Sequence, residues 1–441
     1  MATRIAAASF LAVSVLVAWL TITQPFAARL LQVLIVVSIG YVGWLAIRGA
    51  RVIRDALAQP DESTGSAEGL PFVSIVVPAS NEESVIATAV ASLREQRYAR
   101  PDGTPHYELV VVDDGSADRT GARARDAAAE SPHVVVRRRE RELEPDPRTK
   151  GAVLAWAHPA LRGEVIGALD ADTLVEAAFL ERTMRAWRRD ASADAIQVAR
   201  APRNASVSWL TRAQGEEQLM DLTSQCGRWS TDGTAELRGN GMFVRREALE
   251  AVGGWSAAAL TEDLDLSTRL AAHGRHVTLA PEIAVSEEAV ETIRALWRQR
   301  LRWAEGSLRR LLEHGPGLVL GPQPASRKAD FLAFAGEFLV PPLFAATIVA
   351  SLATIPLPQP ADWSVPAALF ASYGVGIFLL ALGGLWAHGE RGLVLIGRAT
   401  RGALFLSHWL LVVPVVLVRI AFGPKPVGFV QTPRFTGEQG R

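Results

Sequence analysis

The sequence has a single cysteine and few charged residues, and both shortages limit what this protein can be. Cys226 alone excludes an internal disulfide and a zinc cluster built on cysteines, so the soluble part suits a reducing cytosol and Cys226 should simply fill a core. The formal net charge is zero, and no soluble stretch gathers the basic residues, which argues against a nucleic-acid partner. Because 21% of the 441 residues are charged and 49% are hydrophobic, we expect a protein that lies partly in lipid.

Four long apolar runs account for this hydrophobic excess, and each is about as long as a bilayer core requires. They comprise residues 5–22, 30–47, 331–355 and 365–386. We interpret the first two runs as an anchored hairpin with a turn at Gln24 and Pro25, because the second run follows the first at once. A cleaved signal peptide is the alternative for the first run. The last two runs predict a second hairpin.

Basic residues beside the apolar runs predict the orientation of the chain. Arg48, Arg51 and Arg54 flank the second run, and positive residues stay on the cytoplasmic side, so the central region should face the cytosol. A fifth run, residues 402–422, has basic residues before and after it. A single crossing would place one of these basic groups outside, so we interpret this run as an interfacial or re-entrant helix, with a fifth span as the alternative.

The central region alternates short apolar runs with helical patterns. Residues 58–71 are rich in Pro, Asp, Glu, Ser and Gly, which is typical of a flexible linker. Beyond them, the β-branched runs are residues 72–77, 109–112, 134–136, 165–169 and 196–198. This rhythm predicts an α/β domain with a mostly parallel sheet. Ser80 and Glu83 have the spacing of a capping box, which predicts a helix from Glu82 to about Gln96.

Two adjacent carboxylates end the second predicted strand. Residues 110–116 read Val-Val-Val-Asp-Asp-Gly-Ser, so Asp113 and Asp114 lie at a glycine turn and can accept hydrogen bonds from a nucleobase and ribose hydroxyls. In open parallel sheets, ligands bind at the carboxyl ends of the strands. The alternative is an aspartate that caps a helix after a tight turn, with Asp118 in a similar role.

A second acidic pair, Asp170 and Asp172, ends another predicted strand. Alternate residues on such a turn can reach one divalent cation. Magnesium or manganese prefers carboxylate oxygen and would bridge the diphosphate of a donor, offsetting the charge of the leaving group. The alternative is a pair of solvated surface acids.

The segment Thr-Glu-Asp-Leu-Asp-Leu, residues 261–266, adds a third acidic motif. We expect Asp263 to lie just before an amphipathic helix, where its carboxylate could remove the proton of an acceptor hydroxyl. The alternative for Asp263 is again a helix N-cap. We expect Asp265 to serve helix packing.

A fourth motif, Gln-Arg-Leu-Arg-Trp at residues 299–303, falls in a predicted helix. Arg302 could clamp a diphosphate with two hydrogen bonds, and Trp303 offers a flat face to a sugar ring or an acceptor. Membrane-surface anchoring is the alternative. An apolar stripe is predicted along this helix at Leu296, Trp297, Leu301, Leu308 and Leu312.

Together, these motifs resemble glycosyltransferase family 2 over residues 72–312, in its membrane-integrated branch, which includes the cellulose, chitin, hyaluronan and poly-N-acetylglucosamine synthases. The resemblance implies a bacterial protein. The resemblance implies a Rossmann-like nucleotide-sugar transferase domain, an inverting and metal-dependent reaction, and a catalytic domain at the cytosolic face of the plasma membrane. It assigns Asp113 and Asp114 to nucleoside binding and Asp170 and Asp172 to the metal ion and the diphosphate. It assigns Asp263 as the catalytic base. Gln299, Arg302 and Trp303 match the Gln-x-x-Arg-Trp signature of the family.

The resemblance extends to weaker matches on the donor side. They are Pro78, Asn81, Glu82, Lys150 with Gly151, and the Gly-Asn-Gly segment at residues 239–241. Residues 428–434 resemble the gating loop that covers the donor in cellulose synthases, which implies a gating role for Phe429, Thr432 and Arg434. The tail departs from that pattern at Gln431.

The expected acceptor follows from two observations. Two apolar spans after the domain are a thin lining for a channel that would export a polymer. Residues 287–290 and 299–306 are similar to the monoglucosyldiacylglycerol synthases, which implies UDP-glucose as donor and diacylglycerol as acceptor. A synthase of a β-linked polysaccharide, such as poly-N-acetylglucosamine or a cellulose-like polymer, is the alternative. An inactive nucleotide-sensing scaffold is the alternative from another class.

The motifs and apolar runs divide the chain into seven expected segments. In order, these are a membrane hairpin, a linker, a cytosolic transferase domain, interfacial helices with the Gln-x-x-Arg-Trp motif, a second hairpin, an interfacial or membrane helix, and a cytosolic tail. Their expected ranges are 1–57, 58–71, 72–290, 291–330, 331–387, 388–422 and 423–441.

Overall fold

The computed structural model describes residues 2–60, 63, 66–140, 149–321, 323–356 and 363–424. The expected gating residues Phe429, Thr432 and Arg434 lie outside the described residues. The described chain divides into two compact units. We call them the sheet unit, residues 55–207 and 235–291, and the helical unit, residues 2–54, 208–234 and 292–424.

The sheet unit is built on one seven-stranded sheet with the order β3-β2-β1-β4-β6-β5-β7. Its strands are β1 Val73–Ala79, β2 Tyr107–Asp114, β3 Val134–Arg139, β4 Val165–Ala168, β5 Ala195–Pro202, β6 Met242–Arg245 and β7 Val277–Glu287. Within this sheet, only β6 is antiparallel to its neighbours, β4 and β5. The predicted mostly parallel α/β sheet is therefore confirmed, and all five predicted strands are present. The sequence analysis did not predict β6 and β7.

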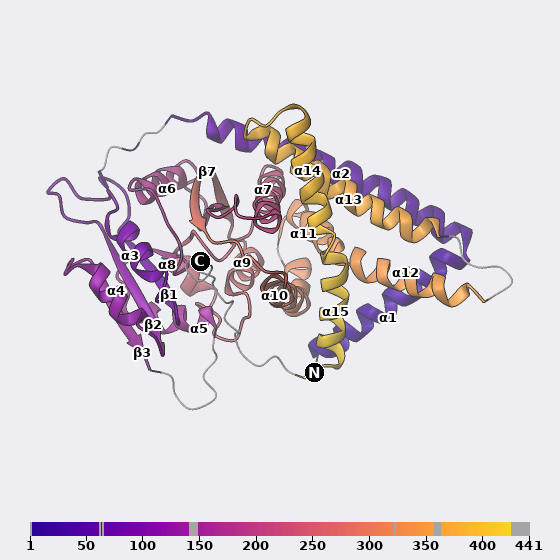
Figure 1. Ribbon diagram of the computed structural model, residues 1–441, viewed down its shortest axis with the longest axis horizontal. Coiled ribbons are helices and arrows are strands. Elements are labelled where there is room, and N and C mark those ends of the chain that lie inside the picture. Colours follow the sequence, from indigo (N-terminus) through magenta and orange to yellow (C-terminus); the bar gives the residue numbers. More distant parts are fainter. Residues whose placement is uncertain are drawn as a thin grey trace. The chain divides into compact units, whose positions relative to one another are not determined.

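Helices connect the strands of the sheet unit (Figure 1). They are α3 Ile86–Arg94, α4 Thr120–Ala128, α5 Lys150–Ala157, α6 Phe179–Arg188, α8 Arg246–Ala251 and α9 Glu262–Ala272, with a 3-10 turn at His158–Ala160. The predicted start of the first of these helices was wrong. Helix α3 begins at Ile86 after an N-cap at Val85, so Ser80 and Glu83 do not form its capping box. Asn81 has a φ of 54°, which takes the chain out of the helical path before α3 begins.

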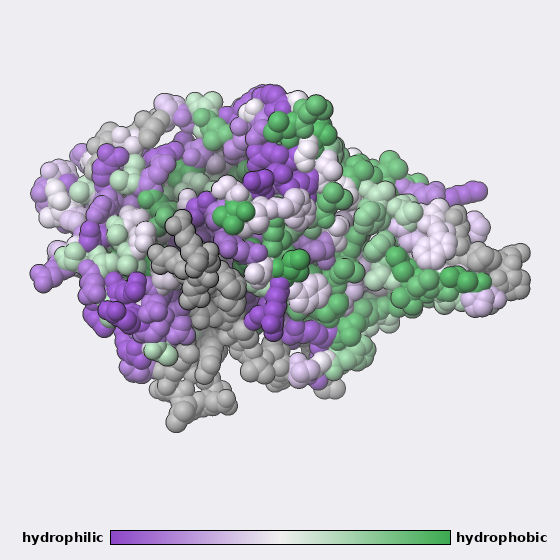
Figure 2. All heavy atoms as spheres, viewed as in Figure 1, coloured by the Kyte–Doolittle hydropathy of each residue, from purple (hydrophilic) through white to green (hydrophobic). Residues whose placement is uncertain are grey.

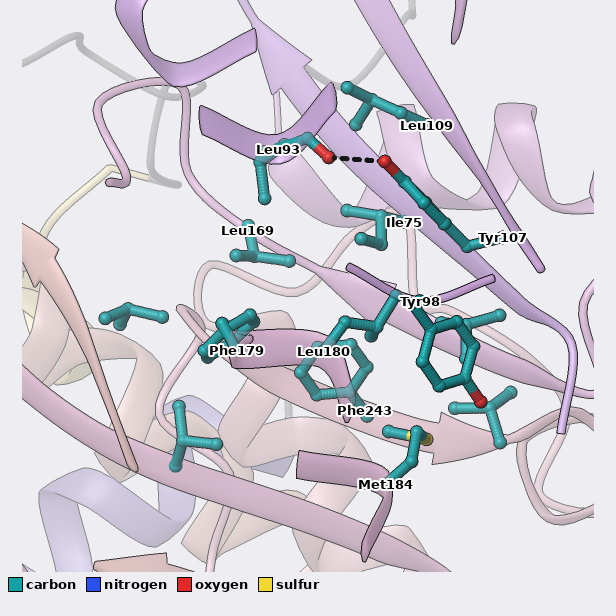
Figure 3. Close-up of a cluster of buried hydrophobic side chains, with 14 of the residues drawn as sticks. Ile75, Leu93, Tyr98, Tyr107, Leu109, Leu169, Phe179, Leu180, Met184 and Phe243 are labelled. Atoms are coloured by element: carbon teal, nitrogen blue, oxygen red, sulfur yellow. Dashed lines mark hydrogen bonds between the residues drawn. The ribbon is translucent and has the colours of Figure 1, made fainter. Parts of the chain in front are cut away.

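The core of the sheet unit lies among strands that are buried on both faces, as expected for a parallel sheet. All eight residues of β2 are buried. Ile75, Leu180 and Phe243 pack in this core, and the Tyr107 hydroxyl donates a hydrogen bond to the Leu93 carbonyl at 3.1 Å (Figure 3). The hydrogen bond allows a tyrosine to be buried in an apolar layer.

Part of the expected flexible linker belongs to this core. Ala67 and Leu70 are buried in it, and Ser66 forms a β-bridge with Ala99. The expectation of a flexible linker is therefore wrong for residues 66–71. Although residues 58–71 are mostly polar, the apolar side chains of Ala67 and Leu70 are buried in the core.

The helical unit consists of α1 Ala2–Thr23, most of α2 Pro25–Leu57, α7 Trp209–Trp229, α10 Ile293–Leu320, α11 Ala325–Glu337, α12 Val340–Thr354, α13 Ser364–Ala387, α14 Gly392–Leu406 and α15 Trp409–Phe422. Among the described residues, five stretches are long and apolar enough to cross a membrane. They are Thr3–Thr23, Pro25–Leu57, Ala325–Thr354, Ser364–Ala387 and Gly392–Phe422. Hydrophobic residues gather on the surface over α1, α12 and α13 (Figure 2). Whether 402–422 crosses the bilayer stays a prediction.

Helix α7 belongs to the helical unit although it lies between β5 and β6 in the sequence. Glycines let its backbone approach neighbouring helices closely. A Cβ atom added at Gly49 would lie 2.0 Å from the Thr223 carbonyl oxygen, and one at Gly227 would lie 2.4 Å from the Leu45 carbonyl oxygen. Small residues at such contacts are typical of helices that pack in membranes. Cys226 is fully buried on α7, which confirms its expected place in a core.

Gly167 of β4 makes room for a core aromatic ring, which predicts a specific cost of filling that space. A Cβ atom at Gly167 would lie 2.4 Å from Cε1 of Phe243. We expect Gly167→Ala to destabilise the protein by about 1–3 kcal/mol, because Phe243 must leave its rotamer. Thermal unfolding in detergent measures this. Gly397→Ala on α14 is the control, since no atom lies within 4 Å of the place its methyl group would take, and an equal loss in both variants would contradict the prediction.

Candidate active site

Two loops meet at the carboxyl ends of β1 and β2. Ala79 pairs with Asp113 in the parallel ladder, so the residues that follow the two strands lie side by side. The Asn81 amide N–H donates to the Ser116 hydroxyl at 3.0 Å, and the Asn81 side-chain oxygen accepts from the Ala117 amide at 2.8 Å. Glu82 donates its amide N–H to the Thr120 hydroxyl at 2.8 Å. The structure therefore brings the predicted donor residues after β1 together with the loop that follows Asp113.

The acidic pair that ends β2 is buried and held by arginines. Asp113 is 2% exposed, and its carboxylate accepts hydrogen bonds from the Ser116 amide at 3.0 Å and from Arg138 at 3.1 Å. Asp114 accepts from Arg139 at 2.6 Å. The arginines end β3, which runs beside β2. These arginines were not predicted as partners, although two arginines at the end of a strand beside an acidic pair are a usable signal.

Asp118 lies ahead of α4 and connects the two loops. Its carboxylate accepts from the Thr120 amide at 2.9 Å and from the Glu83 amide at 3.2 Å. The N-cap residue of α4 is Arg119. Asp118 therefore satisfies an amide at the start of a helix, close to the capping role considered for it, but one residue earlier than an N-cap.

The second acidic pair follows β4 and is organised by one asparagine. Asn240 accepts from the Asp170 amide at 3.2 Å and from the Thr173 hydroxyl at 2.9 Å. Its side-chain nitrogen donates to Glu287 at 3.0 Å. Asp172 is buried and accepts from the Glu288 amide at 3.1 Å. Asn240 is the middle residue of the predicted Gly-Asn-Gly segment, and its amide fixes the turn that carries both acids.

Lys150 links this turn to the third acidic motif. Its ammonium lies 2.5 Å from an Asp170 carboxylate oxygen, 2.6 Å from the Gly239 carbonyl oxygen and 3.7 Å from a Glu262 carboxylate oxygen. Burial lowers the pKa of Lys150, but the neighbouring carboxylates of Asp170 and Glu262 outweigh burial and raise it above its usual value. Lys150 therefore stays charged and holds two predicted motifs together.

Asp263 and Glu262 form the first turn of α9. The N-cap of α9 is Thr261, so both the expected position of Asp263 before the helix and its alternative role as an N-cap are wrong. Burial raises the pKa of Asp263, and burial together with Asp263 raises the pKa of Glu262 to about 7. Asp265 accepts a hydrogen bond from Arg269 at 2.8 Å, which confirms its expected packing role.

Gly239 allows the third motif to approach the second. Its φ is 76°, and a Cβ atom there would lie 3.2 Å from a carboxylate oxygen of Asp263. Both the positive φ and the close approach favour glycine over any other residue. The carbonyl of this same residue accepts from Lys150. One glycine thus places a general-base candidate beside the lysine that contacts Asp170.

Glu287 lies beside the acids of this turn, and its carboxylate is 3.7 Å from the Arg200 guanidinium. Burial raises the pKa of Glu287, and the nearby carboxylates of Asp172 and Asp170 raise it further. Within the described ranges, no three His, Cys, Asp or Glu side chains are arranged to hold a metal ion by themselves. Asp170 and Asp172 still suit a hard divalent cation, which takes oxygen ligands and can draw the remainder from a diphosphate and water.

The Gln-x-x-Arg-Trp signature lies on α10, which belongs to the helical unit. The other predicted site residues that the structure describes belong to the sheet unit. The Gln299 side-chain oxygen accepts from Arg300 at 3.0 Å. Arg302 and Trp303 are half-buried. Of the predicted apolar stripe, Leu296 and Leu308 are buried, and Trp297 is 40% exposed.

Comparisons with known proteins found a family model and several relatives that match this chain. A family model described as "Glycosyltransferase like family 2" matches residues 71–306. The "Beta-monoglucosyldiacylglycerol synthase" of Synechocystis sp. is 33% identical over 399 residues, which cover 88% of this chain and 81% of that protein. The "Poly-beta-1,6-N-acetyl-D-glucosamine synthase" of Staphylococcus aureus is 25% identical over 271 residues, covering 60% of this chain and 61% of that protein.

A solved structure shares the fold. It is the mannosyltransferase PcManGT from Pyrobaculum calidifontis in complex with GDP-Man and Mn2+, with a TM-score of 0.56 and 20% sequence identity. The match covers 89% of this chain and 99% of that chain. The likeness therefore extends well beyond the sheet unit alone.

The Lys150 bridge predicts a pH-dependent loss of stability in Lys150→Met. Glu262 has a pKa of about 7, so it is mostly protonated at pH 5 and needs no counter-ion there, whereas at pH 8 it is ionised and buried. We expect the variant to melt below the parent at both pH values because Asp170 also loses its partner, with the larger deficit at pH 8. Differential scanning fluorimetry at pH 5 and pH 8 measures this.

Lys328→Met is the matched control for that comparison. Lys328 lies on α11, and its side chain makes no hydrogen bond or ion pair with the residues that the structure describes. Its removal should change the melting temperature little and equally at both pH values. A Lys150→Met deficit that is no larger at pH 8 than at pH 5 would contradict the bridge.

Proposed function

This chain belongs to glycosyltransferase family 2, and on that premise we propose that it transfers a sugar from a UDP-sugar to a lipid acceptor in the membrane, with inversion at the anomeric carbon. One observation carries the proposal. Three acidic motifs that are far apart in the sequence gather at the carboxyl edge of one sheet, where Lys150 contacts both Asp170 and Glu262. Open α/β sheets bind their ligands at this edge.

The donor occupies this edge in the proposed complex. Asp113 and Asp114 accept hydrogen bonds from the nucleoside, with the loop after β1 beside them. The proposal also includes Pro78, near the end of β1, and Asn81 and Glu82 in the loop that follows it. The arginine partners of the two aspartates support this role, because their hydrogen bonds fix the orientation of both buried carboxylates.

Asp170 and Asp172 hold the metal ion in this proposal. A Mg2+ or Mn2+ ion bound there supplies positive charge to the diphosphate as the sugar departs. Lys150 adds a further positive charge beside Asp170. The carboxylates of Asp170 and Asp172 beside Glu287 support a cation at this position, since they add to the effect of burial in raising the pKa of Glu287.

Asp263 acts as the general base. Its carboxylate takes the proton from the acceptor hydroxyl while the hydroxyl oxygen forms a bond to the anomeric carbon. The bond from that carbon to the phosphate oxygen breaks, and its electron pair leaves with UDP. Because attack and departure occur on opposite faces, an α-linked donor gives a β-linked product. The raised pKa of Asp263 supports this role, since a base is most effective when its pKa approaches the working pH.

The resemblance of the Gln-x-x-Arg-Trp motif adds Gln299, Arg302 and Trp303 to the proposal, with Arg302 as a ligand of the diphosphate and Trp303 as a contact of the sugar or the acceptor. A gating role for Phe429, Thr432 and Arg434, which lie outside the described residues, also rests on resemblance alone. The five long apolar helices support a multi-pass protein of the plasma membrane, with the sheet unit in the cytosol.

UDP-glucose and diacylglycerol are the proposed substrates, and the product is then a β-monoglucosyldiacylglycerol. The similarity to proteins named beta-monoglucosyldiacylglycerol synthase supports this choice, because it covers 88% of the chain at 33% identity. The similarity to the poly-β-1,6-N-acetyl-D-glucosamine synthase covers 60% at 25% identity and favours a polymer as the second candidate.

An assay of labelled sugar separates these candidates. Membranes containing the protein are incubated with diacylglycerol, Mg2+ or Mn2+, and either UDP-[14C]glucose or UDP-[14C]N-acetylglucosamine. We expect glucose label in the organic phase as a lipid that β-glucosidase degrades. Label in an alcohol-insoluble fraction would instead support the polymer, and no transfer of either label would contradict both.

Asp263→Asn separates donor binding from transfer. The amide has nearly the same shape as the carboxylate but cannot accept the proton, so we expect transfer to fall by about 100-fold or more. UDP affinity, measured by isothermal titration calorimetry with Mn2+, should change little. Asp265→Asn on the same helix is the control, because Asp265 pairs with Arg269 and should leave transfer near the parent rate. Substantial transfer by Asp263→Asn would exclude it as the base.

A further inference from the structure

Two adjacent glutamates of α7 connect it to different helices of the helical unit. Glu216 is 1% exposed and accepts hydrogen bonds from Arg398 at 3.0 Å and Arg401 at 2.7 Å, both on α14. Glu217 pairs instead with Arg300 on α10, and it accepts from the indole N–H of Trp409 on α15 at 3.4 Å. Neither glutamate belongs to a motif that the sequence analysis identified.

Arg300 touches two of the three signature residues. It is 1% exposed, and one of its N–H groups donates to the Gln299 side-chain oxygen at 3.0 Å. Its guanidinium carbon lies 4.2 Å from the centre of a Trp303 ring and 5.9 Å from that of Trp409. A planar guanidinium stacks on aromatic faces while its edge forms hydrogen bonds. Arg300 can therefore orient an amide and an indole at once.

Glu217 provides the carboxylate that allows the Arg300 guanidinium to be buried. An isolated guanidinium in an apolar interior would carry a large desolvation cost, and a paired carboxylate offsets it. The ion pair also fixes the plane of the guanidinium, because the carboxylate and the Gln299 oxygen hold different N–H groups of it. Glu217 of α7 therefore fixes the orientation of the Arg300 guanidinium, against which Trp303 packs.

We propose that Glu217 and Arg300 are positioning residues of the transferase, which fix the side chains of Gln299 and Trp303 in the geometry that transfer requires. This inference rests on the proposed function of the signature. Helix α7 thereby contributes to the site through α10 rather than by touching substrate. A misplacement of about 1 Å at a reacting centre can lower a rate by about 100-fold, so the loss of this pair should act mainly on the rate.

The neighbouring glutamates offer a matched comparison between Glu217→Gln and Glu216→Gln. Both variants remove one charge from a buried ion pair of the same helix, so both should lower the melting temperature. We expect Glu217→Gln to lower kcat by about 10- to 100-fold while the KM for the nucleotide sugar stays within about threefold of the parent. Glu216→Gln should keep kcat near the parent value, because its partners lie on α14.

Arg300→Lys provides a second variant that keeps the charge. Lysine can pair with Glu217 but lacks the planar fork that stacks on Trp303, so we expect a similar fall in kcat with a smaller loss of stability. If Glu217→Gln does not fold, this variant tests the proposal by itself. Parent kcat in Arg300→Lys, or equal losses of kcat in Glu216→Gln and Glu217→Gln, would overturn the positioning role.

Assays of the parent enzyme distinguish a failure of the positioning role from a failure of the proposed function. Transfer by the parent and unchanged kcat in Glu217→Gln would refute the positioning pair and leave the proposed function intact. Absence of transfer by the parent with any UDP-sugar, together with absence of UDP binding in the presence of Mn2+, would refute the proposed function itself.

Discussion

The site depends on gathering several carboxylates in a small and largely buried space. Burial raises the pKa values of Glu262, Asp263 and Glu287, and neighbouring carboxylates raise those of Glu262 and Glu287 further. Lys150 offsets part of this charge by contacting Asp170 and Glu262. In the proposed reaction, a cation at Asp170 and Asp172 would offset more of it, and Asp263 would act as the base. The same arrangement therefore explains metal binding, donor binding and proton transfer in the proposed reaction.

Much of this arrangement could be predicted from the sequence, because parallel strands end at one edge of a sheet. The motifs of Asp113 and Asp170 each follow a β-branched run, so their proximity required only the strand order. The partners were harder to predict. Arg138 and Asn240 act through side-chain contacts between segments far apart in the sequence, and no local pattern encodes such contacts. The helix start at Ile86 depends on the positive φ of Asn81, which tertiary hydrogen bonds stabilise.

In the helical unit, the sequence shows where the arginines are but not which carboxylates they pair with. The expectation of an interfacial helix at residues 402–422 rested on basic residues on both sides of this run, among them Arg398, Arg401 and Arg419. In the structure, the first two pair with buried Glu216, and Arg419 lies 3.3 Å from Glu305. A charge that is paired in this way has a lower free-energy cost of burial in an apolar phase than an unpaired charge. The membership of α7 in this unit was equally hidden, because its glycine contacts with α2 and its ion pairs become visible only in three dimensions.

The central claim is that Asp170 and Asp172 form one cation-dependent donor site at the carboxyl edge of the sheet. UDP affinity measured by isothermal titration calorimetry, with and without Mn2+, tests this claim most directly. The account predicts that the parent binds UDP much more tightly with Mn2+ and that Asp170→Asn/Asp172→Asn abolishes this difference while remaining folded. Equal enhancement by Mn2+ in the parent and the double variant would contradict it.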